Sequence, residues 1–185
     1  DRNKGKLQYA AFNPAGDKVA FAFENDLYYQ DLNSGAVVRI TTDGKQNEII
    51  NGTTDWVYEE ELSFVKAFEW SPDGRRIAYY RFDEREVPEF TMTNYHDELY
   101  PEYVTFKYPK VGEQNAVVSI QLYELAGRKA TTVDVGEKTD QYIPRIRWTR
   151  DPQQLCVYRM NRHQNHLELL LADAATGKTH LLFEE

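Results

Sequence analysis

Residues 70–79 read Trp-Ser-Pro-Asp-Gly-Arg-Arg-Ile-Ala-Tyr: an aromatic residue, a proline turn and then an apolar strand. The pattern recurs at residues 12–21, Phe-Asn-Pro-Ala-Gly-Asp-Lys-Val-Ala-Phe, and more loosely at residues 148–157, Trp-Thr-Arg-Asp-Pro-Gln-Gln-Leu-Cys-Val. Proline presets φ in such a turn and glycine accepts a positive φ, so each copy predicts two antiparallel strands joined by a tight turn. The third copy is displaced by one residue and lacks the glycine.

Further strand signals follow the first and third copies. Residues 27–32 and 37–41 flank a turn at 33–36, and residues 167–173 and 180–183 flank another at 174–178. Four short strands per unit, with no long helical pattern, are typical of a β-propeller blade. We therefore predict an all-β fold, a partial β-propeller of about three four-stranded antiparallel blades. The units cover about residues 7–62, 63–136 and 137–185. Because propellers typically have about four to eight blades, we expect the chain to be part of a larger propeller.

The repeats are spaced unequally. Phe12 and Trp70 are 58 positions apart, and Trp70 and Trp148 are 78 positions apart, whereas a plain blade takes about 40–45 residues. The spacing indicates two insertions, at about residues 46–62 and 87–117. Long insertions in a compact repeat are usually functional or disordered, and the tyrosines of the second one argue against disorder. A hairpin that covers the edge of a blade is its simplest interpretation.

Composition excludes several classes. The net charge of −8 argues against a nucleic-acid partner, which needs a clustered basic surface. No apolar run reaches the ~18 residues of a membrane span, and no signal peptide opens the chain. The single cysteine, Cys156, cannot form an intrachain disulfide and is typical of a small apolar strand residue.

The sequence offers few other reactive groups. His163 and His166 have metal-ligand spacing, but no third ligand is near in sequence, so a turn between strands is the better interpretation and no metal site is predicted. No cofactor is predicted. All serines lie outside a Gly-x-Ser-x-Gly nucleophile elbow: Ser34, Ser63, Ser71 and Ser119.

The first insertion contains the most unusual stretch, residues 51–62, Asn-Gly-Thr-Thr-Asp-Trp-Val-Tyr-Glu-Glu-Glu-Leu. Three adjacent carboxylates are most often a solvated surface. Adjacent residues of a strand point to opposite faces, whereas on a helix they diverge by about 100°, so two of them can flank one small cation. If they act together, we expect a short helical turn from Trp56 to Leu62, with Thr54 or Asp55 as its N-cap.

These motifs resemble the N-terminal propeller of dipeptidyl peptidase IV-like enzymes, in the prolyl oligopeptidase class of serine peptidases. The resemblance is dense from about residue 7 to 125, and the Asp-Trp-Val-Tyr-Glu-Glu-Glu string is its most specific part. It rests on Leu7-Gln-Tyr-Ala, on residues 51–62, on Trp70-Ser-Pro-Asp-Gly, on Glu86-Val-Pro, on Tyr108-Pro-Lys-Val-Gly and on Asn115-Ala-Val-Val.

The resemblance implies roles for individual residues. In the family, the last two acids of the string bind the free amino terminus of the substrate, which places this role on Glu60 and Glu61. Glu59 is the preceding acid and supports the site, as do Trp56 and Tyr58. The catalytic triad of the family belongs to an α/β-hydrolase domain that follows the propeller, so we expect no catalytic residue in this chain and no activity from it alone. The family's arginine for the substrate carbonyl is expected before residue 1.

The resemblance also implies a function for the parent protein. The chain is expected to be roughly blades three to five of an eight-bladed propeller. It would bind substrate for a serine exopeptidase that releases Xaa-Pro or Xaa-Ala dipeptides. Residues 87–117 would form an arm that makes a homodimer. The parent would be extracytoplasmic (periplasmic, cell-surface or secreted), with its signal or anchor outside this chain.

Three alternatives remain. A prolyl tripeptidyl peptidase could share this scaffold with a shifted amino-terminus site. Inactive relatives of such enzymes keep the propeller, so a non-enzymatic interaction scaffold is also open. A glycosidase that uses Glu60 and Glu61 as acid and base is disfavoured, because such carboxylates lie ~5–9.5 Å apart and usually come from separate elements.

Overall fold

The computed structural model describes residues 6–96 and 99–185. Within these ranges the chain is almost entirely strand. The elements are β1 (Gln8–Phe12), β2 (Lys18–Phe23), β3 (Asp26–Asp31), β4 (Val37–Arg39), β5 (Ile49–Asn51), α1 (Trp56–Glu60), β6 (Phe68–Trp70), β7 (Arg76–Asp83), β8 (Glu89–Asn94), β9 (Glu102–Lys107), β10 (Val117–Glu124), β11 (Lys129–Thr132), β12 (Gln141–Trp148), β13 (Gln154–Asn161), β14 (Leu167–Asp173) and β15 (Thr179–Glu184).

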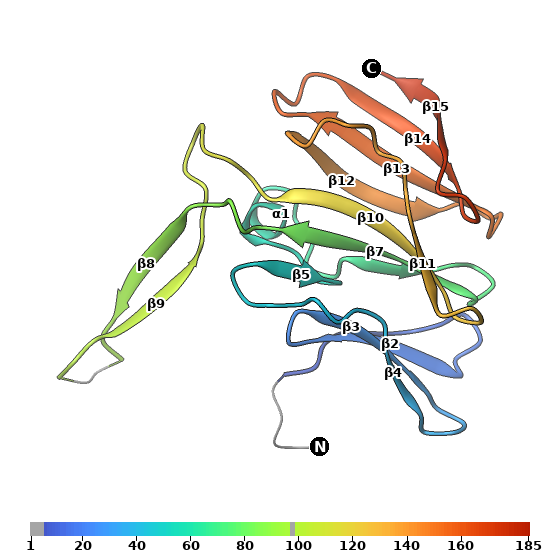
Figure 1. Ribbon diagram of the computed structural model, residues 1–185, viewed down its shortest axis with the longest axis horizontal. Helices are drawn as coiled ribbons and strands as arrows, with labels where there is room; N and C mark the ends of the chain where they lie inside the picture. Colours follow the sequence, from blue (N-terminus) through green and yellow to red (C-terminus); the bar gives the residue numbers. More distant parts are fainter. Residues whose placement is uncertain (1–5, 97–98) are drawn as a thin grey trace.

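Three antiparallel sheets follow one another along the chain. The first has the order β1-β2-β3-β4 and the third β12-β13-β14-β15, while the second is built on β7, β10 and β11 with β5 and β6. Figure 1 shows them one above another, with the N-terminal sheet at the bottom and the C-terminal sheet at the top. The sheets do not close into a ring within the described residues. The all-β, partial β-propeller fold predicted from the repeats is therefore confirmed.

The first two proline turns have the predicted geometry. Gly16 donates its N–H to the carbonyl of Asn13 at 3.0 Å, and Gly74 donates to the carbonyl of Ser71 at 2.9 Å. Both glycines have positive φ angles, 72° and 67°. The third copy closes without glycine, since Gln154 donates its N–H to the carbonyl of Asp151 at 3.1 Å.

The tryptophan of the second and of the third repeat joins its sheet to the sheet before it. The indole N–H of Trp70, in β6, donates to the carbonyl of Ala11, in β1, at 3.0 Å. The indole N–H of Trp148, in β12, donates to the carbonyl of Glu69, in β6, at 3.1 Å. Ala11 and Glu69 each directly precede the aromatic residue of their own repeat. The same bond therefore recurs at equivalent positions and connects β6 to β1 and β12 to β6.

The core lies mainly between the second and third sheets. Its large buried side chains come from α1, β7, β10 and the third sheet, and a smaller cluster lies between the first and second sheets. The largest fully buried side chains include Tyr58, Phe68, Phe82, Ile120, Ile143 and Leu155. Among the described residues no helix has the length and apolar character needed to span a membrane.

Residues 52–67, which we call the α1 loop, interrupt an edge strand. β5 pairs with residues 81–83 of β7 and β6 pairs with residues 77–79, so both lie along one edge of β7. The two halves meet at Tyr80, whose carbonyl accepts the N–H of Gly52 at 3.1 Å and whose N–H donates to Ala67 at 2.9 Å. Ala67 also donates its N–H to Gly52 at 3.0 Å, which closes the neck of the loop.

This pairing moves a boundary that the repeat spacing suggested. The spacing assigned residues up to 62 to the first unit, but β5 pairs with the second sheet. The spacing counted residues between proline turns and could not show that one strand is split by an inserted loop.

Gly52 turns the chain out of the strand at φ 77°, where a Cβ would lie 2.9 Å from Leu27.

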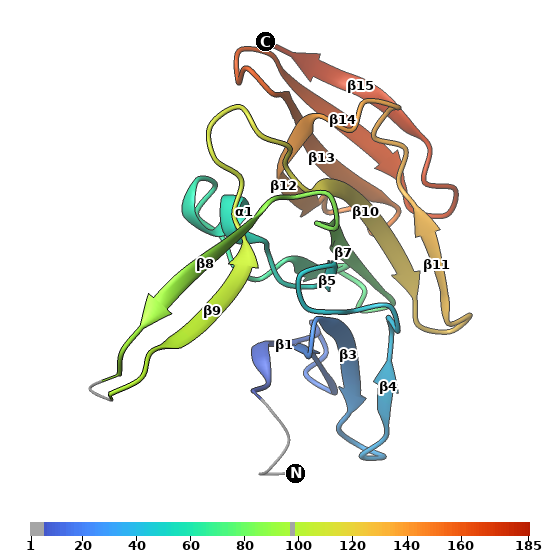
Figure 2. The ribbon, with the colours of Figure 1, turned by 60° about the vertical axis from the view of Figure 1, so that its left-hand side comes forward.

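The second insertion, residues 87–117, is the arm. Its strands β8 and β9 form a separate two-stranded sheet, with Phe90 opposite Phe106 and Met92 opposite Val104. Figures 1 and 2 both show this hairpin extending away from the three sheets, so it does not cover the edge of a blade. Its base is attached by the side-chain amide of Asn47, which donates to the carbonyl of Thr105 at 3.2 Å.

Replacing Trp148 by Phe should destabilise the fold. The change removes the indole N–H and deprives the carbonyl of Glu69 of its partner, at a cost of about 1–2 kcal/mol in the free energy of unfolding. Urea denaturation followed by circular dichroism measures the loss, and Trp70→Phe should behave alike. Trp56→Phe is the matched control, because its indole makes no inter-sheet hydrogen bond among the described residues. Equal losses in all three variants would contradict the role of the bond.

Candidate functional site

Helix α1 forms where the sequence predicted a helical turn. Asp55 is its N-cap: the backbone is extended there (ψ 176°), and the carboxylate accepts the N–H of Tyr58 at 3.0 Å. The helix ends at Glu60 and Glu61 is its C-cap, so it is slightly shorter than the predicted turn to Leu62. Of the two predicted caps, Asp55 is the one used.

Tyr58 fixes the helix to the third sheet. Its side chain is 2 % exposed, and its hydroxyl accepts the N–H of Ile143, at the start of β12, at 2.8 Å. Its ring packs edge-on against Phe82, with 4.9 Å between the ring centroids. One side chain therefore holds α1 against β7 and β12.

Trp56 joins the helix to the base of the arm. Its ring centroid lies 4.3 Å from that of Tyr108, which in turn packs against Phe90 at 5.5 Å. The two insertions that the spacing identified separately are therefore in contact. Figure 2 shows α1 beside the point where the arm leaves the second sheet.

The three glutamates of the α1 loop point in different directions. All three are exposed. Glu59 lies near Tyr9 of β1, where its charge adds to the burial that raises the pKa of that phenol. Glu61 lines a groove beside the arm, and Glu60 lies between them on the helix, since successive residues diverge by about 100°. No ion pair joins these carboxylates to a cation of residues 6–96 or 99–185.

The groove beside Glu61 runs between α1 and the arm. We call it the arm groove; its volume is about 750 Å³. Aromatic and apolar side chains form most of its wall, including Trp56, Phe90 and Tyr108, while Lys110 and Arg162 add positive charge. The structure thus brings Glu61 and Trp56 to one cavity, while Glu59 faces away toward β1.

Two buried carboxyl groups lie behind the helix. Asp55 was predicted only as a possible N-cap, and Glu84 was not predicted to have a role. Asp55 is 7 % exposed, and burial raises its pKa to about 6, partly offset by the N–H of Tyr58. Glu84 is 6 % exposed, and burial, together with the charge of Asp55, raises its pKa to about 7, partly offset by the ammonium of Lys107. The N-cap of helix α1 is therefore a carboxyl group, Asp55, with a pKa of about 6.

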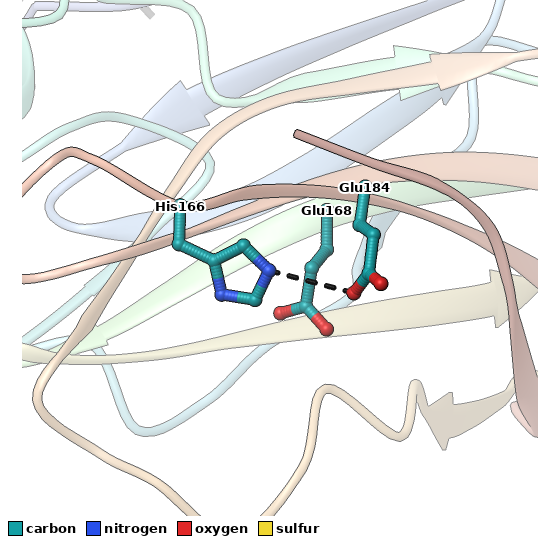
Figure 3. Close-up of side chains that lie close together, drawn as sticks. All are labelled: His166, Glu168 and Glu184. Carbon is teal, nitrogen blue, oxygen red and sulfur yellow. Dashed lines mark ion pairs between the residues drawn. The ribbon is translucent and has the colours of Figure 1, made fainter.

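A separate group of side chains lies on the third sheet. His163 lies in the turn between β13 and β14, as predicted, while His166 lies near Glu168 and Glu184 (Figure 3). The imidazole Nε2 of His166 is 3.5 Å from Glu184, but both oxygens of Glu168 are bound by Arg159, at 2.6 and 2.7 Å. Because the guanidinium already neutralises Glu168, we assign the group to an ion-pair network.

The pH dependence of stability should reveal the buried acids. In the unfolded chain Asp and Glu have pKa values of about 3.9 and 4.3, below the folded values of about 6 and about 7. The folded state therefore retains protons that the unfolded state has lost, and these two groups destabilise the fold as pH rises from about 4 to about 7. Asp55→Asn keeps an N-cap acceptor without the charge. As the pH rises from 4 to 8, its free energy of unfolding should therefore increase by about 2–3 kcal/mol relative to that of the wild type.

Urea denaturation at a series of pH values measures this difference. Asp55→Ser is the matched variant, because it retains a capping oxygen and lacks a carboxylate. The two variants should show the same flattened profile relative to the wild type. Profiles parallel to that of the wild type would mean that Asp55 is ionised freely in the folded protein.

Comparisons with known proteins identify the family of this chain. The family described as the dipeptidyl peptidase IV (DPP IV) N-terminal region matches residues 1–185. A probable dipeptidyl-aminopeptidase B of Phaeosphaeria nodorum is 36% identical over 97% of this chain and 21% of its own length. An inactive dipeptidyl peptidase 10 of Mus musculus is 35% identical over 92% of this chain and 22% of its own length.

A solved structure gives the same result. The crystal structure of Porphyromonas gingivalis dipeptidyl peptidase 4 matches all of this chain with a TM-score of 0.95 and 38% sequence identity, over 26% of that chain. The chain thus spans about a fifth to a quarter of the length of these proteins. The match covers the whole of residues 1–185, and the chain belongs to the dipeptidyl peptidase IV N-terminal region family.

Proposed function

We propose that this chain is the substrate-binding propeller portion of a dipeptidyl peptidase IV-like serine exopeptidase, and that Glu60 and Glu61 bind the free amino terminus of its peptide substrates. The observation that carries the proposal is a pair of exposed carboxylates, without an ion pair to any cation of residues 6–96 and 99–185, at the end of a helix. The position of this helix is fixed by Asp55, Tyr58 and Trp56. The bond-breaking groups belong to another domain of the parent protein.

The chemistry of an α-ammonium suits this site. It carries one positive charge and three donors, so two carboxylates can each accept a charge-assisted hydrogen bond. The C-terminal end of a helix also favours a cation, and the last turn of α1 contains no basic residue. A neutral peptide nitrogen supplies neither the charge nor the donors, and it would leave the carboxylates unpaired as the substrate covers them. The site would therefore select peptides with a free amino terminus over blocked or internal ones.

The fixed position of the helix would set where the peptide is cut. Binding the amino terminus at a constant distance from a nucleophile determines how many residues are released, which is catalysis by positioning. Dipeptide release, with proline or alanine second, is our first proposal, and tripeptide release is its alternative. Chromogenic substrates with the sequences Xaa-Pro and Xaa-Xaa-Pro distinguish dipeptide release from tripeptide release.

Substitution of the two glutamates in the full-length parent should weaken catalysis. Each charge-assisted hydrogen bond is worth about 1.5–3 kcal/mol, so Glu60→Gln and Glu61→Gln should each lower kcat/KM for a free Xaa-Pro substrate by about 10- to 100-fold. Glu59→Gln is the matched control on the same helix and should lower kcat/KM less than threefold, because Glu59 faces β1.

Acetylated substrates complete this test. The wild type should cleave them poorly, and the two variants should discriminate less between free and acetylated forms. Equal wild-type rates on free and acetylated substrates would contradict binding of the ammonium. A loss in Glu59→Gln as large as in the other two variants would contradict the assignment to Glu60 and Glu61.

We also propose that the arm forms a homodimer of the parent. Apolar side chains are exposed on one face of the hairpin: Phe90 is 38% exposed, Val104 41% and Met92 52%. A contiguous exposed apolar surface of this kind is typical of a protein interface. Phe90, Met92, Val104 and Phe106 lie on one face of the hairpin, because their positions alternate along the paired strands.

A charge pair on that face should separate the subunits. Met92→Lys combined with Val104→Glu keeps a favourable cross-strand pair and removes the apolar surface, so the hairpin should remain folded. Light scattering on the parent should then give the mass of a monomer. The matched control, Thr91→Lys with Thr105→Glu, places the same charges on the opposite face and should leave a dimer. A dimer in both double variants would refute the role of this face.

One comparison supports a second function. A relative named as an inactive dipeptidyl peptidase is about as similar to this chain as the relatives named as enzymes. A non-enzymatic interaction scaffold would keep the propeller and the arm without hydrolysis. No release of dipeptide or tripeptide from any Xaa-Pro or Xaa-Xaa-Pro peptide by the purified parent would favour the scaffold.

A further inference from the structure

A second cavity adjoins the C-terminal part of the α1 loop, between β6 of the second sheet and β12 of the third. We call it the basic pocket; its volume is about 530 Å³. It is lined by residues 63–66, which return the α1 loop to β6, by Tyr80 of β7, and by residues 145–147 of β12. Strands β6 and β12 are in contact here, joined by the indole of Trp148.

The charge of this pocket is opposite to that of the protein. Lys66, Arg145 and Arg147 line it with one carboxylate, Glu69, whereas the whole chain carries a net charge of −8. Glu69 is ion-paired with Arg147. Lys66 and Arg145 have no carboxylate partner among residues 6–96 and 99–185, so two cations remain to be neutralised.

The two remaining cations are held by aromatic rings. The guanidinium of Arg145 lies 5.0 Å from the ring centre of Phe64, and the ammonium of Lys66 lies 5.2 Å from that of Phe68. Rings orient a cation but do not neutralise it. Partial burial, and to a smaller extent the charge of Arg147, lower the pKa of Lys66, so the pocket without an anion disfavours its charged form.

A buried donor completes the pocket. Tyr80 is only 2% exposed, and its hydroxyl has no hydrogen-bond partner in the part of the chain that the structure describes. Buried hydroxyl groups are normally bonded, so an orphaned one in the wall of a cavity indicates a missing acceptor. An anion that accepts from Tyr80 and faces Lys66 and Arg145 would satisfy all three groups.

We propose that the basic pocket binds a carboxylate of the same peptide whose amino terminus Glu60 and Glu61 bind. This inference rests on the proposed peptide-binding function and extends it to a substrate preference. The acidic end of α1 and the basic pocket are consecutive parts of one loop, since Glu61 and Ser63 are two residues apart. A peptide with an amino-terminal ammonium and a carboxylate farther along carries the complementary pattern of charge. The carboxylate is either an Asp or Glu side chain or the carboxyl terminus of a short peptide.

The test uses the full-length parent and a set of Xaa-Pro peptides of four to six residues. Glu is placed at each position in turn and compared with Gln, and each peptide is made with a free and an amidated carboxyl terminus. For at least one position or for the free terminus, the wild type should prefer the carboxylate by about tenfold in kcat/KM, as expected for one charge-assisted contact. The position that shows the preference identifies the source of the carboxylate.

Variants then assign the preference to the pocket. Arg145→Gln and Lys66→Gln should each reduce it to less than threefold and leave kcat/KM for neutral, amidated peptides within twofold of the wild type. Arg145→Lys keeps the charge and should retain most of the preference, which separates a folding defect from a lost contact. Arg150→Gln is the matched control, an exposed residue of the turn after β12 with the same change in charge.

Two results would overturn the proposal. One is equal kcat/KM for every Glu and Gln pair and for free and amidated termini in the wild type. The other is a loss of activity on neutral peptides as large as on acidic ones in both Lys66→Gln and Arg145→Gln. Glu60→Gln and Glu61→Gln give an independent result: a carboxylate preference that survives in them while discrimination against blocked termini is unaltered would reject the amino-terminus site and retain the pocket.

Discussion

The structure depends on one repeated contact, the hydrogen bond from a tryptophan indole to a backbone carbonyl of the preceding sheet. Trp70 and Trp148 make it to Ala11 and Glu69, which occupy equivalent positions in consecutive repeats. Within a sheet the backbone ladder fixes the strands, but nothing in that ladder fixes one sheet against the next. The indoles do so between β6 and β1 and between β12 and β6, where their rings also bury apolar surface. Together with the side chains packed between the sheets, they give adjacent sheets a defined relative position.

The candidate site uses this fixed position. The α1 loop leaves an edge strand and returns to it at Tyr80, so its neck is as rigid as the sheet. A loop of sixteen residues would still be mobile at its far end, but Tyr58 reaches across to Ile143 of the next sheet and Trp56 packs on the arm. Strand β7, strand β12 and the arm, which are far apart in sequence, therefore hold one turn of helix. The glutamates of that turn are free to face solvent because Trp56, Val57 and Tyr58 supply its packing.

The sequence predicted the parts of this arrangement that follow from local rules. Proline turns, aromatic repeat positions and the helical turn at Trp56 are encoded by residues that are close together, and the structure confirms each of them. The split strand could not be predicted, because the pairing of β5 and β6 with a single strand is a tertiary fact. Asp55 and Glu84 were not recognised as a buried acidic pair for the same reason, since they are adjacent only in space. For the basic pocket the sequence did contain a signal: Arg145 and Arg147 are two positions apart, so they lie on the same face of a strand.

The α1 loop carries carboxylates at the end of its helix and borders the basic pocket farther along. An acidic protein repels anions in general, so a site that holds a carboxylate needs local cations that outweigh the distant negative charges, and screening over about 8–10 Å makes this possible. The same negative background would assist the cationic end of a peptide, which we propose that Glu60 and Glu61 bind. Neither glutamate forms an ion pair with a base of the described residues. Salt should therefore weaken the two contacts differently, because the ammonium is attracted by the whole protein while the carboxylate is attracted only by its pocket. The loop would then orient a peptide by charge before any side chain is recognised.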